Sequence, residues 1–274
     1  MQAQPVATEQ EPAVSNILPE EGSGGISEIL RTPLSIWLWL EIAVVSILAF
    51  LFSSLALVLF YPFDRRRIIA GHIVRLGSVS AVKLNPMWKF DVRGQLPRPL
   101  PKKTVFVSNH CSHTDPFLIA HLPVAMRWLA KASLFKIPFL GWAMRIAGDI
   151  AVKRGDANSA REAMKKCADW LDQGVSVVIF PEGTRSKTAE LLPFKNGAFR
   201  LAIETGADIL PLAVAGTHTA LRKHDWKAGY SHGHLNIGQP ISTQGMTLED
   251  VPVLRERVRA EIVRLRAELG ALSS

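Results

Sequence analysis

The sequence predicts an α/β fold in which a mixed sheet is flanked by helices and preceded by an N-terminal hydrophobic helix that anchors the chain to a membrane. From residue 88 onward, short runs of β-branched and aromatic residues alternate with helical patterns, which is typical of a parallel or mixed sheet covered by helices. Residues 34–61 are apolar almost throughout, which is typical of a membrane helix. A chain of 274 residues that is 48% hydrophobic can also bury a substantial core.

The first 33 residues are predicted to form a disordered acidic tail. They are rich in Gln, Glu, Ser, Gly and Pro and contain few large apolar residues, so burial cannot offset the entropy of the chain. Residues 1–30 contain five glutamates and no Lys or Arg, so the formal net charge of +8 leaves +13 on the rest of the protein. The body therefore favours a negatively charged partner. We expect no nucleic-acid partner, because the basic residues do not form one run interleaved with stacking aromatic residues.

Residues 34–84 are predicted to hold the membrane anchor and an interfacial helix. The uncharged run from Ile42 to Phe60 is 19 residues long, about the length of a helix that crosses a ~30 Å hydrocarbon layer. No small-residue cleavage site follows this run, so we expect a retained anchor rather than a signal peptide. The arginines at positions 65–67 outnumber Arg31 on the other flank, which predicts that the following domain lies on the cytoplasmic face. Length leaves open whether the anchor spans the bilayer or enters one leaflet, and the second helix is equally consistent with a plain buried helix.

Residues 85–274 are predicted to form the globular α/β domain. Strands are expected at residues 88–92, 104–109, 126–130, 149–152, 175–180, 209–214 and 234–238, and helices at residues 158–173, 196–206 and 247–269. Asn158 is expected to cap the first of these helices and Gly174 to end it. Thr247 and Asp250 have the spacing of a capping box. In such sheets, functional residues gather on the loops that follow the strands.

The first polar cluster, SNHCSHTDPF at residues 108–117, leaves a strand and enters a helix. Asp115 precedes a proline, so the simplest structural interpretation makes it a helix cap. Three chemical interpretations remain beside that polar loop. His110, His113 and Asp115 could bind a metal ion, Cys111 could be a nucleophile, or His110 could be a general base whose tautomer is fixed by Asp115.

The second polar cluster, FPEGTRS, follows the strand predicted at residues 175–180. Gly183 allows close approach of the backbone to a ligand, and Arg185 with the Thr184 hydroxyl can receive a phosphate. Glu182 could accept a hydrogen bond from a substrate hydroxyl. Lys131 and Lys136 could add phosphate contacts, although exposed turns and surface lysines explain the same residues. The remaining histidines match no common metal spacing, and we expect surface or core positions for His218, His224, His232 and His234.

Four blocks resemble the glycerolipid acyltransferases, most closely the 1-acyl-glycerol-3-phosphate (lysophosphatidate) acyltransferases. NHCSHTD resembles their N-H-x-S-x-x-D block, and AKASLFKIPFLGWAMRIAGDIAVKR, FPEGTRS and ILPLAV resemble the next three, in the same order, over roughly residues 85–240. The resemblance implies that His110 is the base and Asp115 its partner. It also implies that the acceptor is held by Lys131, Glu182, Gly183, Thr184 and Arg185. Lys153 stands before Arg154 where an acidic or small residue is more usual, which leaves the role of Arg154 open.

The resemblance implies transfer of a fatty acyl group to the free hydroxyl of 1-acyl-glycerol-3-phosphate, giving phosphatidic acid. The donor would be acyl-CoA or acyl carrier protein, with no further cofactor and no metal. The sequence has no G-x-S-x-G elbow, which favours direct attack without an acyl-enzyme. Another lysolipid acceptor, a membrane-anchored metal hydrolase and a catalytically silent lipid-binding protein remain as alternatives.

Overall fold

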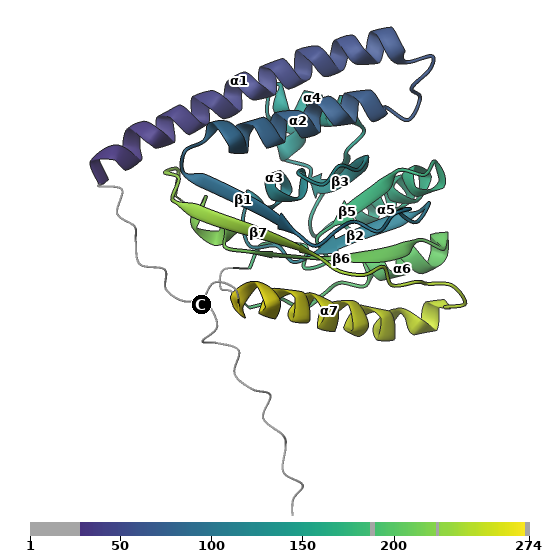
Figure 1. Ribbon diagram of the computed structural model, residues 1–274. Coiled ribbons are helices and arrows are strands. Elements are labelled where there is room, and N and C mark those ends of the chain that lie inside the picture. Colours follow the sequence, from purple (N-terminus) through teal and green to yellow (C-terminus); the bar gives the residue numbers. More distant parts are fainter. Residues whose placement is uncertain (1–27, 187–189, 223–224, 272–274) are drawn as a thin grey trace, which may run out of the picture.

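A computed structural model describes residues 28–186, 190–222 and 225–271 (Figure 1). The first helix begins at Glu28, so the boundary expected after residue 33 falls inside that helix. The rest of the expected acidic tail, and His224, lie outside the described residues.

Seven strands form one sheet in the order β1-β7-β6-β2-β5-β3-β4. Their bounds are β1 Trp88–Arg93, β2 Thr104–Ser108, β3 Met126–Lys131, β4 Ile150–Val152, β5 Ser176–Ile179, β6 Asp208–Ala215 and β7 Ser231–Ile237. Strands β2 to β6 are parallel, and β7 runs antiparallel to β6 while β1 pairs parallel to β7. The predicted mixed sheet is confirmed. The carboxyl ends of β2 to β6 therefore open at one edge, which is also the edge where β7 begins.

Helices cover both faces of the sheet (Figure 1). Their bounds are α1 Glu28–Phe60, α2 Ile68–Leu84, α3 Asp115–Ile119, α4 Leu140–Ala147, α5 Ala157–Asp172, α6 Gly197–Thr205 and α7 Val251–Ala271. Alternate residues of β2 lie in two hydrophobic cores, one on each face of the sheet. Val105 and Val107 pack with α5, α6 and α7, whereas Phe106 packs with α3. Every residue of β2 is buried, as expected for a parallel strand covered on both faces. This central strand ends directly at the first polar cluster.

Two of the predicted helix ends are confirmed and one is corrected. Gly174, in the left-handed conformation at φ 74°, directly follows the C-cap of α5, and Thr247 with Asp250 forms the capping box before α7. The N-cap of α5 is Asp156 rather than Asn158. Asp156 has an extended backbone and its carboxylate accepts the Ser159 N–H at 2.9 Å, whereas Asn158 already lies inside the helix.

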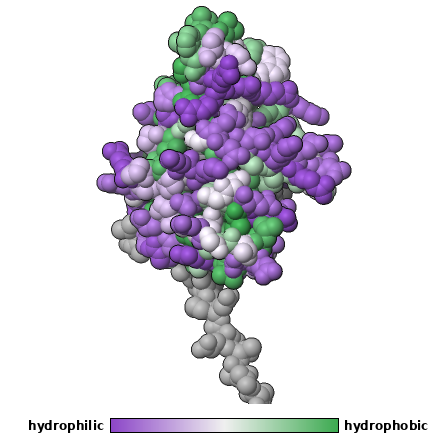
Figure 2. Space-filling model, turned by 90° about the vertical axis from the view of Figure 1, so that its right-hand side faces the viewer, coloured by the Kyte–Doolittle hydropathy of each residue, from purple (hydrophilic) through white to green (hydrophobic). Residues whose placement is uncertain are grey.

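Helix α1 packs along α2 and α4 and forms the outer layer on one side of the sheet (Figure 1). It is long and apolar enough to cross a membrane, and only 17% of its most apolar window is buried. Its N-terminal part is fixed to the segment before β7, because Arg31 pairs with Asp225 at 2.7 Å and Trp39 donates to the Trp226 carbonyl. Figure 2 shows apolar side chains gathered at the α1 end of the molecule, above a mostly hydrophilic body.

The outward face of α1 carries a continuous apolar stripe whose residues recur at helical spacing. No other part of the described protein covers this stripe. Its exposed members include Ile36, Leu40, Val44, Leu48, Leu51, Leu55 and Leu59. Because large apolar groups in water cost free energy in proportion to their area, such a stripe indicates an apolar partner.

Candidate active site

The two polar clusters predicted from the sequence meet at the carboxyl edge of the sheet. His110 and Asp115 follow β2, and residues 181–186 follow β5, the strand paired with β2. The backbone N–H of His110 donates to Glu182 Oε1 at 2.8 Å, and the N–H of Ser186 donates to the His110 carbonyl at 2.9 Å. The two loops therefore form one unit.

A fully buried carboxylate orients the imidazole of His110. Nδ1 of His110 lies 2.8 Å from Asp115 Oδ2, which also accepts the backbone N–H groups of Cys111 and Ser112. The other carboxylate oxygen, Oδ1, accepts the hydroxyl of Thr217 at 2.5 Å. An ionised carboxylate only accepts hydrogen bonds, so this arrangement assigns the ring proton to Nδ1 and leaves Nε2 as the basic nitrogen. Asp115 is the first residue of α3 and turns back toward its own loop, so the simple helix-cap interpretation is wrong.

The plane of the His110 ring is fixed by stacking on Phe180, with ring centroids 4.1 Å apart and 17° between the planes. Trp128 continues the stack at 6.3 Å from Phe180. Sequence reasoning missed Phe180, which looked like the plain end of a strand, and Thr217. Thr217 lies only three residues beyond the fourth block, ILPLAV, and that proximity was the one available signal.

Glu182 is buried and both of its carboxylate oxygens are engaged by the backbone. Oε1 accepts from His110, and Oε2 accepts the Leu192 N–H at 3.2 Å. Burial raises the pKa of Glu182 to about 7, against the two backbone hydrogen bonds that lower it. The resemblance implied that Glu182 holds the acceptor. Its observed contacts also tie the loop that carries His110 to the loop after β5.

Asn109 joins the same loop to the neighbouring strand. Its side-chain amide donates to the Val214 carbonyl at 2.9 Å and accepts the Val214 N–H at 2.8 Å, which extends the pairing of β2 with β6 by one residue. Cys111 lies next to this contact, and burial, followed by the nearby charge of Asp115, raises the pKa of its thiol to about 12. A thiol held protonated in this way is a poor nucleophile, which argues against the cysteine alternative.

Cationic side chains surround the loop after β5. Desolvation, then repulsion from Arg154, lowers the pKa of Arg185, so the two guanidinium groups lie close enough to interact. A Cβ added to Gly183, whose φ is +67°, would lie 2.8 Å from Nζ of Lys195. Desolvation, then the charge of Arg185, lowers the pKa of His113 to about 4, so this ring is neutral near pH 7. Arg154, Arg185 and Lys195 thus form a cationic group beside His110, which we call the cationic group below.

Of the remaining predicted residues, Lys131 ends β3 and Lys136 follows it, farther along the same edge, and Thr184 lies beside Arg185. Lys131 is the exposed last residue of β3 and pairs in register with Val152 of β4, which precedes Arg154 by two residues. Thr184 is exposed in the loop after β5, and Lys136 lies in the short helical turn Leu134–Lys136.

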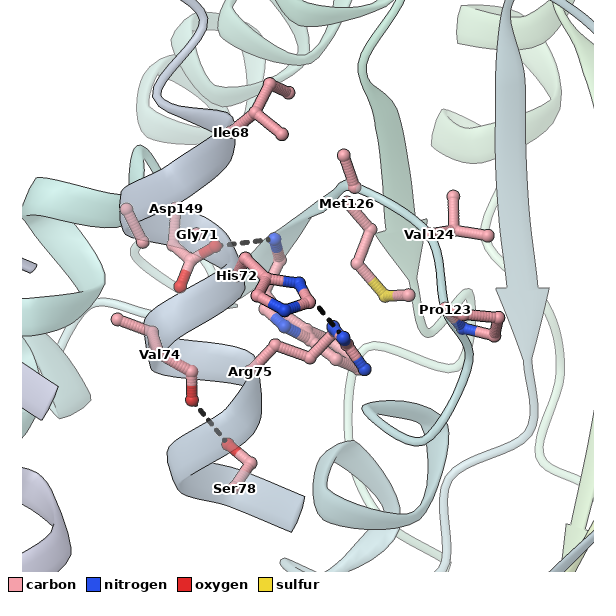
Figure 3. Close-up of a pocket in the computed structure, with 13 residues that line it drawn as sticks. Ile68, Gly71, His72, Val74, Arg75, Ser78, Pro123, Val124, Met126 and Asp149 are labelled. Carbon is pink, nitrogen blue, oxygen red and sulfur yellow. Dashed lines mark hydrogen bonds between the residues drawn. The ribbon is translucent and has the colours of Figure 1, made fainter. Parts of the chain in front are cut away.

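A pocket of about 250 Å³ lies between α2 and the segment that leads into β3 (Figure 3). One wall is α2, and the other is formed by the segment that leads into β3 and by Trp128, the outermost ring of the stack on His110. His72 and Arg75 of α2 point into it and contact each other at 3.0 Å. The pocket therefore reaches from α2 to Trp128 and is separated from His110 by the ring of Phe180.

Residues 89–215 match the family model described as acyltransferase. The chain is 37% identical over 156 residues to the chloroplastic 1-acyl-sn-glycerol-3-phosphate acyltransferase of Brassica napus, a match that covers 57% of this chain and 45% of that protein. It is 32% identical over 184 residues to the human 1-acyl-sn-glycerol-3-phosphate acyltransferase alpha, covering 66% of this chain and 65% of that one. The chain thus spans less than half the length of the Brassica relative.

The fold is similar to that of a solved structure, the 1-acyl-sn-glycerophosphate acyltransferase of Thermotoga maritima. The TM-score is 0.72 at 25% sequence identity, and the match covers 89% of this chain and 97% of that one. The similarity extends beyond residues 89–215, because 89% coverage requires elements on both sides of that segment.

Proposed function

Because residues 89–215 match the acyltransferase family model, we propose that the chain transfers a fatty acyl group from a thioester to the free hydroxyl of 1-acyl-glycerol-3-phosphate, giving phosphatidic acid. One observation carries this proposal above the others. The basic nitrogen of an imidazole, oriented by a buried carboxylate, lies at the same edge of the sheet as a group of three cations.

The reaction needs a base because a lipid hydroxyl is a poor nucleophile until its proton is being removed. Nε2 of His110 takes that proton as the hydroxyl oxygen attacks the thioester carbonyl. The C–S bond then breaks, an ester forms, and the thiol leaves with the proton from the imidazolium. Asp115 stabilises the charge that develops on the ring, and the donor is acyl-CoA or acyl carrier protein.

The cationic group supplies the second requirement, which is to hold the acceptor so that its hydroxyl rather than water meets the thioester. Arg185 offers a planar guanidinium that can bind phosphate through two parallel hydrogen bonds, and Lys195 and Arg154 add charge. Lys131 lies along the same edge and extends this surface. Gly183 and Thr184 then present backbone and hydroxyl groups to the phosphate.

Helix α1 gives the site access to its amphiphilic acceptor. Its exposed apolar stripe fits a hydrocarbon environment, and α1 packs along α2 rather than standing apart from the domain. We place α1 within one leaflet, with its stripe toward the acyl chains, because an upright α1 would carry the packed α2 and α4 into the bilayer. The arginines at positions 65–67 favour the cytoplasmic leaflet.

The test uses the purified full-length chain in lipid, labelled acyl-CoA or acyl carrier protein, and matched acceptors. We expect phosphatidic acid from 1-acyl-glycerol-3-phosphate and at least about tenfold slower acylation of a lysolipid that lacks a terminal phosphate, since one charge-assisted contact is worth about 1.5–3 kcal/mol. Equal rates with all lysolipids would overturn the acceptor assignment. Hydrolysis abolished by a chelator, with no acyl transfer, would favour the metal hydrolase.

A further inference from the structure

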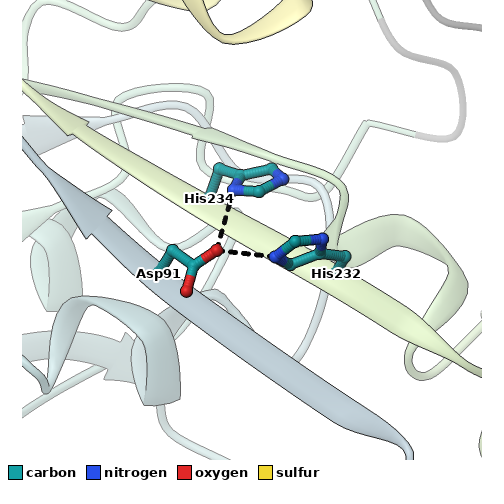
Figure 4. A group of neighbouring side chains, drawn as sticks. All are labelled: Asp91, His232 and His234. Carbon is teal, nitrogen blue, oxygen red and sulfur yellow. Dashed lines mark hydrogen bonds and ion pairs between the residues drawn. The ribbon is translucent and has the colours of Figure 1, made fainter. Parts of the chain in front are cut away.

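Three side chains converge on β1 and β7, the two strands at one side of the sheet. None of them belongs to the loop that carries His110. Asp91 projects from β1, and His232 and His234 project from β7 (Figure 4). Asp91 Oδ2 lies 2.6 Å from His232 Nε2 and 3.6 Å from His234 Nδ1, and the two imidazole centroids are 4.1 Å apart. One ligand atom from each residue lies within 4.8 Å of the other two, a grouping of three metal-binding side chains found once among the described residues.

The strand register explains why these residues converge. Asp91 pairs directly with His234 across β1 and β7, and His232 lies two residues earlier on the same face of β7. Asn236, two residues farther on, donates to the Leu265 carbonyl and to Glu268, so this face is the one covered by α7. His234 is buried against that layer, whereas the side chain of His232 is 38% exposed. The group thus has one buried member, His234, and two that solvent reaches, because the side chain of Asp91 is also 42% exposed.

We propose that Asp91, His232 and His234 bind one divalent transition-metal ion, with Zn²⁺ as the reference case. Bonds of about 2.0–2.2 Å in tetrahedral geometry place ligand atoms roughly 3.4 Å apart. The Asp91–His234 distance of 3.6 Å already matches, and His232 has to move away from Asp91 by less than the length of one bond. Two imidazoles and one carboxylate favour zinc, cobalt, nickel or copper over magnesium or calcium, which prefer oxygen ligands. The exposed side of His232 leaves room for a water ligand.

The site would act as a tie between two strands. In the part of the chain that the structure describes, β1 is an edge strand paired with β7, and it directly follows α2, the helix beneath α1. A metal ion shared by β1 and β7 would fix the point at which the helical layer joins the sheet. An ion that binds the folded state but not the unfolded state stabilises the folded state by mass action. Bound metal therefore raises the melting temperature.

The experiment titrates the full-length chain in detergent with Co²⁺ and with Zn²⁺. We expect about one Co²⁺ per chain, seen by visible absorption, and a rise in melting temperature of a few degrees with Zn²⁺ but not with Mg²⁺. His232→Ala and His234→Ala should each weaken metal binding by more than about tenfold. Asp91→Asn should weaken it as much, although the asparagine side chain has nearly the same volume as the aspartate. His72→Ala, which removes an imidazole from α2, is the matched control and should bind as the parent protein does.

Two outcomes overturn the proposal: no Co²⁺ binding by the parent protein, or binding that survives in the His232→Ala variant. If His234→Ala fails to fold because that residue is buried, His232→Ala and Asp91→Asn still decide, because both positions are partly exposed. Binding lost in His110→Ala but kept in His232→Ala would place the ion in the loop after β2 instead. Acyl transfer is measured separately, so failure of the metal site leaves the proposed reaction untouched.

Discussion

Glu182 holds the backbone nitrogen of His110 at 2.8 Å, although 71 residues separate them in the chain. The position of the imidazole is therefore set by the loop after the neighbouring strand as well as by its own. The same loop carries Arg185, so a disturbance that moves one cluster also moves the other. This coupling explains why the variants below need readouts that separate chemistry, acceptor binding and folding.

Replacement of His110 by alanine should lower turnover by at least about 10², because the hydroxyl loses its general base. The far-ultraviolet circular dichroism should change little, since the backbone of residue 110 keeps its hydrogen bonds to Glu182 and Ser186. His121→Gln is the control: that imidazole lies two residues beyond α3 and contacts the Phe117 carbonyl of that helix at 2.9 Å. Normal turnover in His110→Ala would remove this residue from the reaction.

Replacement of Thr217 by valine should lower turnover by roughly tenfold to a hundredfold while the KM for the acceptor stays constant. The hydroxyl donates to Asp115, and loss of one hydrogen bond to a charged group costs about 1.5–3 kcal/mol. Thr217→Ser keeps the hydroxyl and should restore most of the activity. A valine variant as fast as the parent protein would show that the hydroxyl does not matter, and a serine variant as slow as the valine variant would show that the methyl group matters as well.

Replacement of Arg185 by alanine should raise the KM for 1-acyl-glycerol-3-phosphate by about tenfold or more and leave the KM for the thioester unchanged. The KM for acceptors without a phosphate should rise much less, so the preference of the enzyme for the phosphate-bearing acceptor becomes smaller. Arg200→Ala on α6 removes an exposed guanidinium paired with Glu204 and serves as the control. An unchanged acceptor preference in Arg185→Ala would contradict the phosphate assignment.

Glu182 should give the protein a stability that falls as the pH rises. Its pKa in the folded state is about 7 against an ordinary value of 4.5, so the folded state binds more protons than the unfolded state between these values. The contribution of Glu182 to the free energy of unfolding should therefore decrease from pH 4.5 to pH 7, by on the order of 1–3 kcal/mol. Glu182→Gln removes the titrating group and should flatten this part of the profile, measured by urea unfolding at each pH. Identical slopes in the two proteins would show that Glu182 stays ionised throughout.

The strands could be predicted because the central ones are continuous apolar runs. The polar loops that follow them resemble the sequence blocks of a known family and occur in the same order. The same reasoning failed where a contact depends on register or on a distant loop. Asp156 replaces Asn158 as a cap because the preceding turn decides which residue stays extended. Phe180 and Thr217 contact the site from other strands and loops, and their spacing in the sequence does not predict these contacts. For His232 and His234 the sequence predicts only surface or core positions, because their neighbour Asp91 lies about 140 residues away on the adjacent strand.

Attachment to the membrane should depend on the exposed stripe of α1. In the double variant Leu48→Glu/Leu55→Glu, two charges replace large side chains that are 45% and 53% exposed, so the fold keeps its contacts while the stripe loses its affinity for hydrocarbon. Co-flotation with vesicles that contain anionic lipid should fall by at least about tenfold, whereas acyl transfer to an acceptor dissolved in detergent should stay within about twofold. Val253→Glu on α7 alters a side chain that is 66% exposed on the opposite side of the sheet, and it should float like the parent protein. Equal flotation of the double variant would mean that α1 does not rest in the leaflet and that the arginines or another surface hold the protein there.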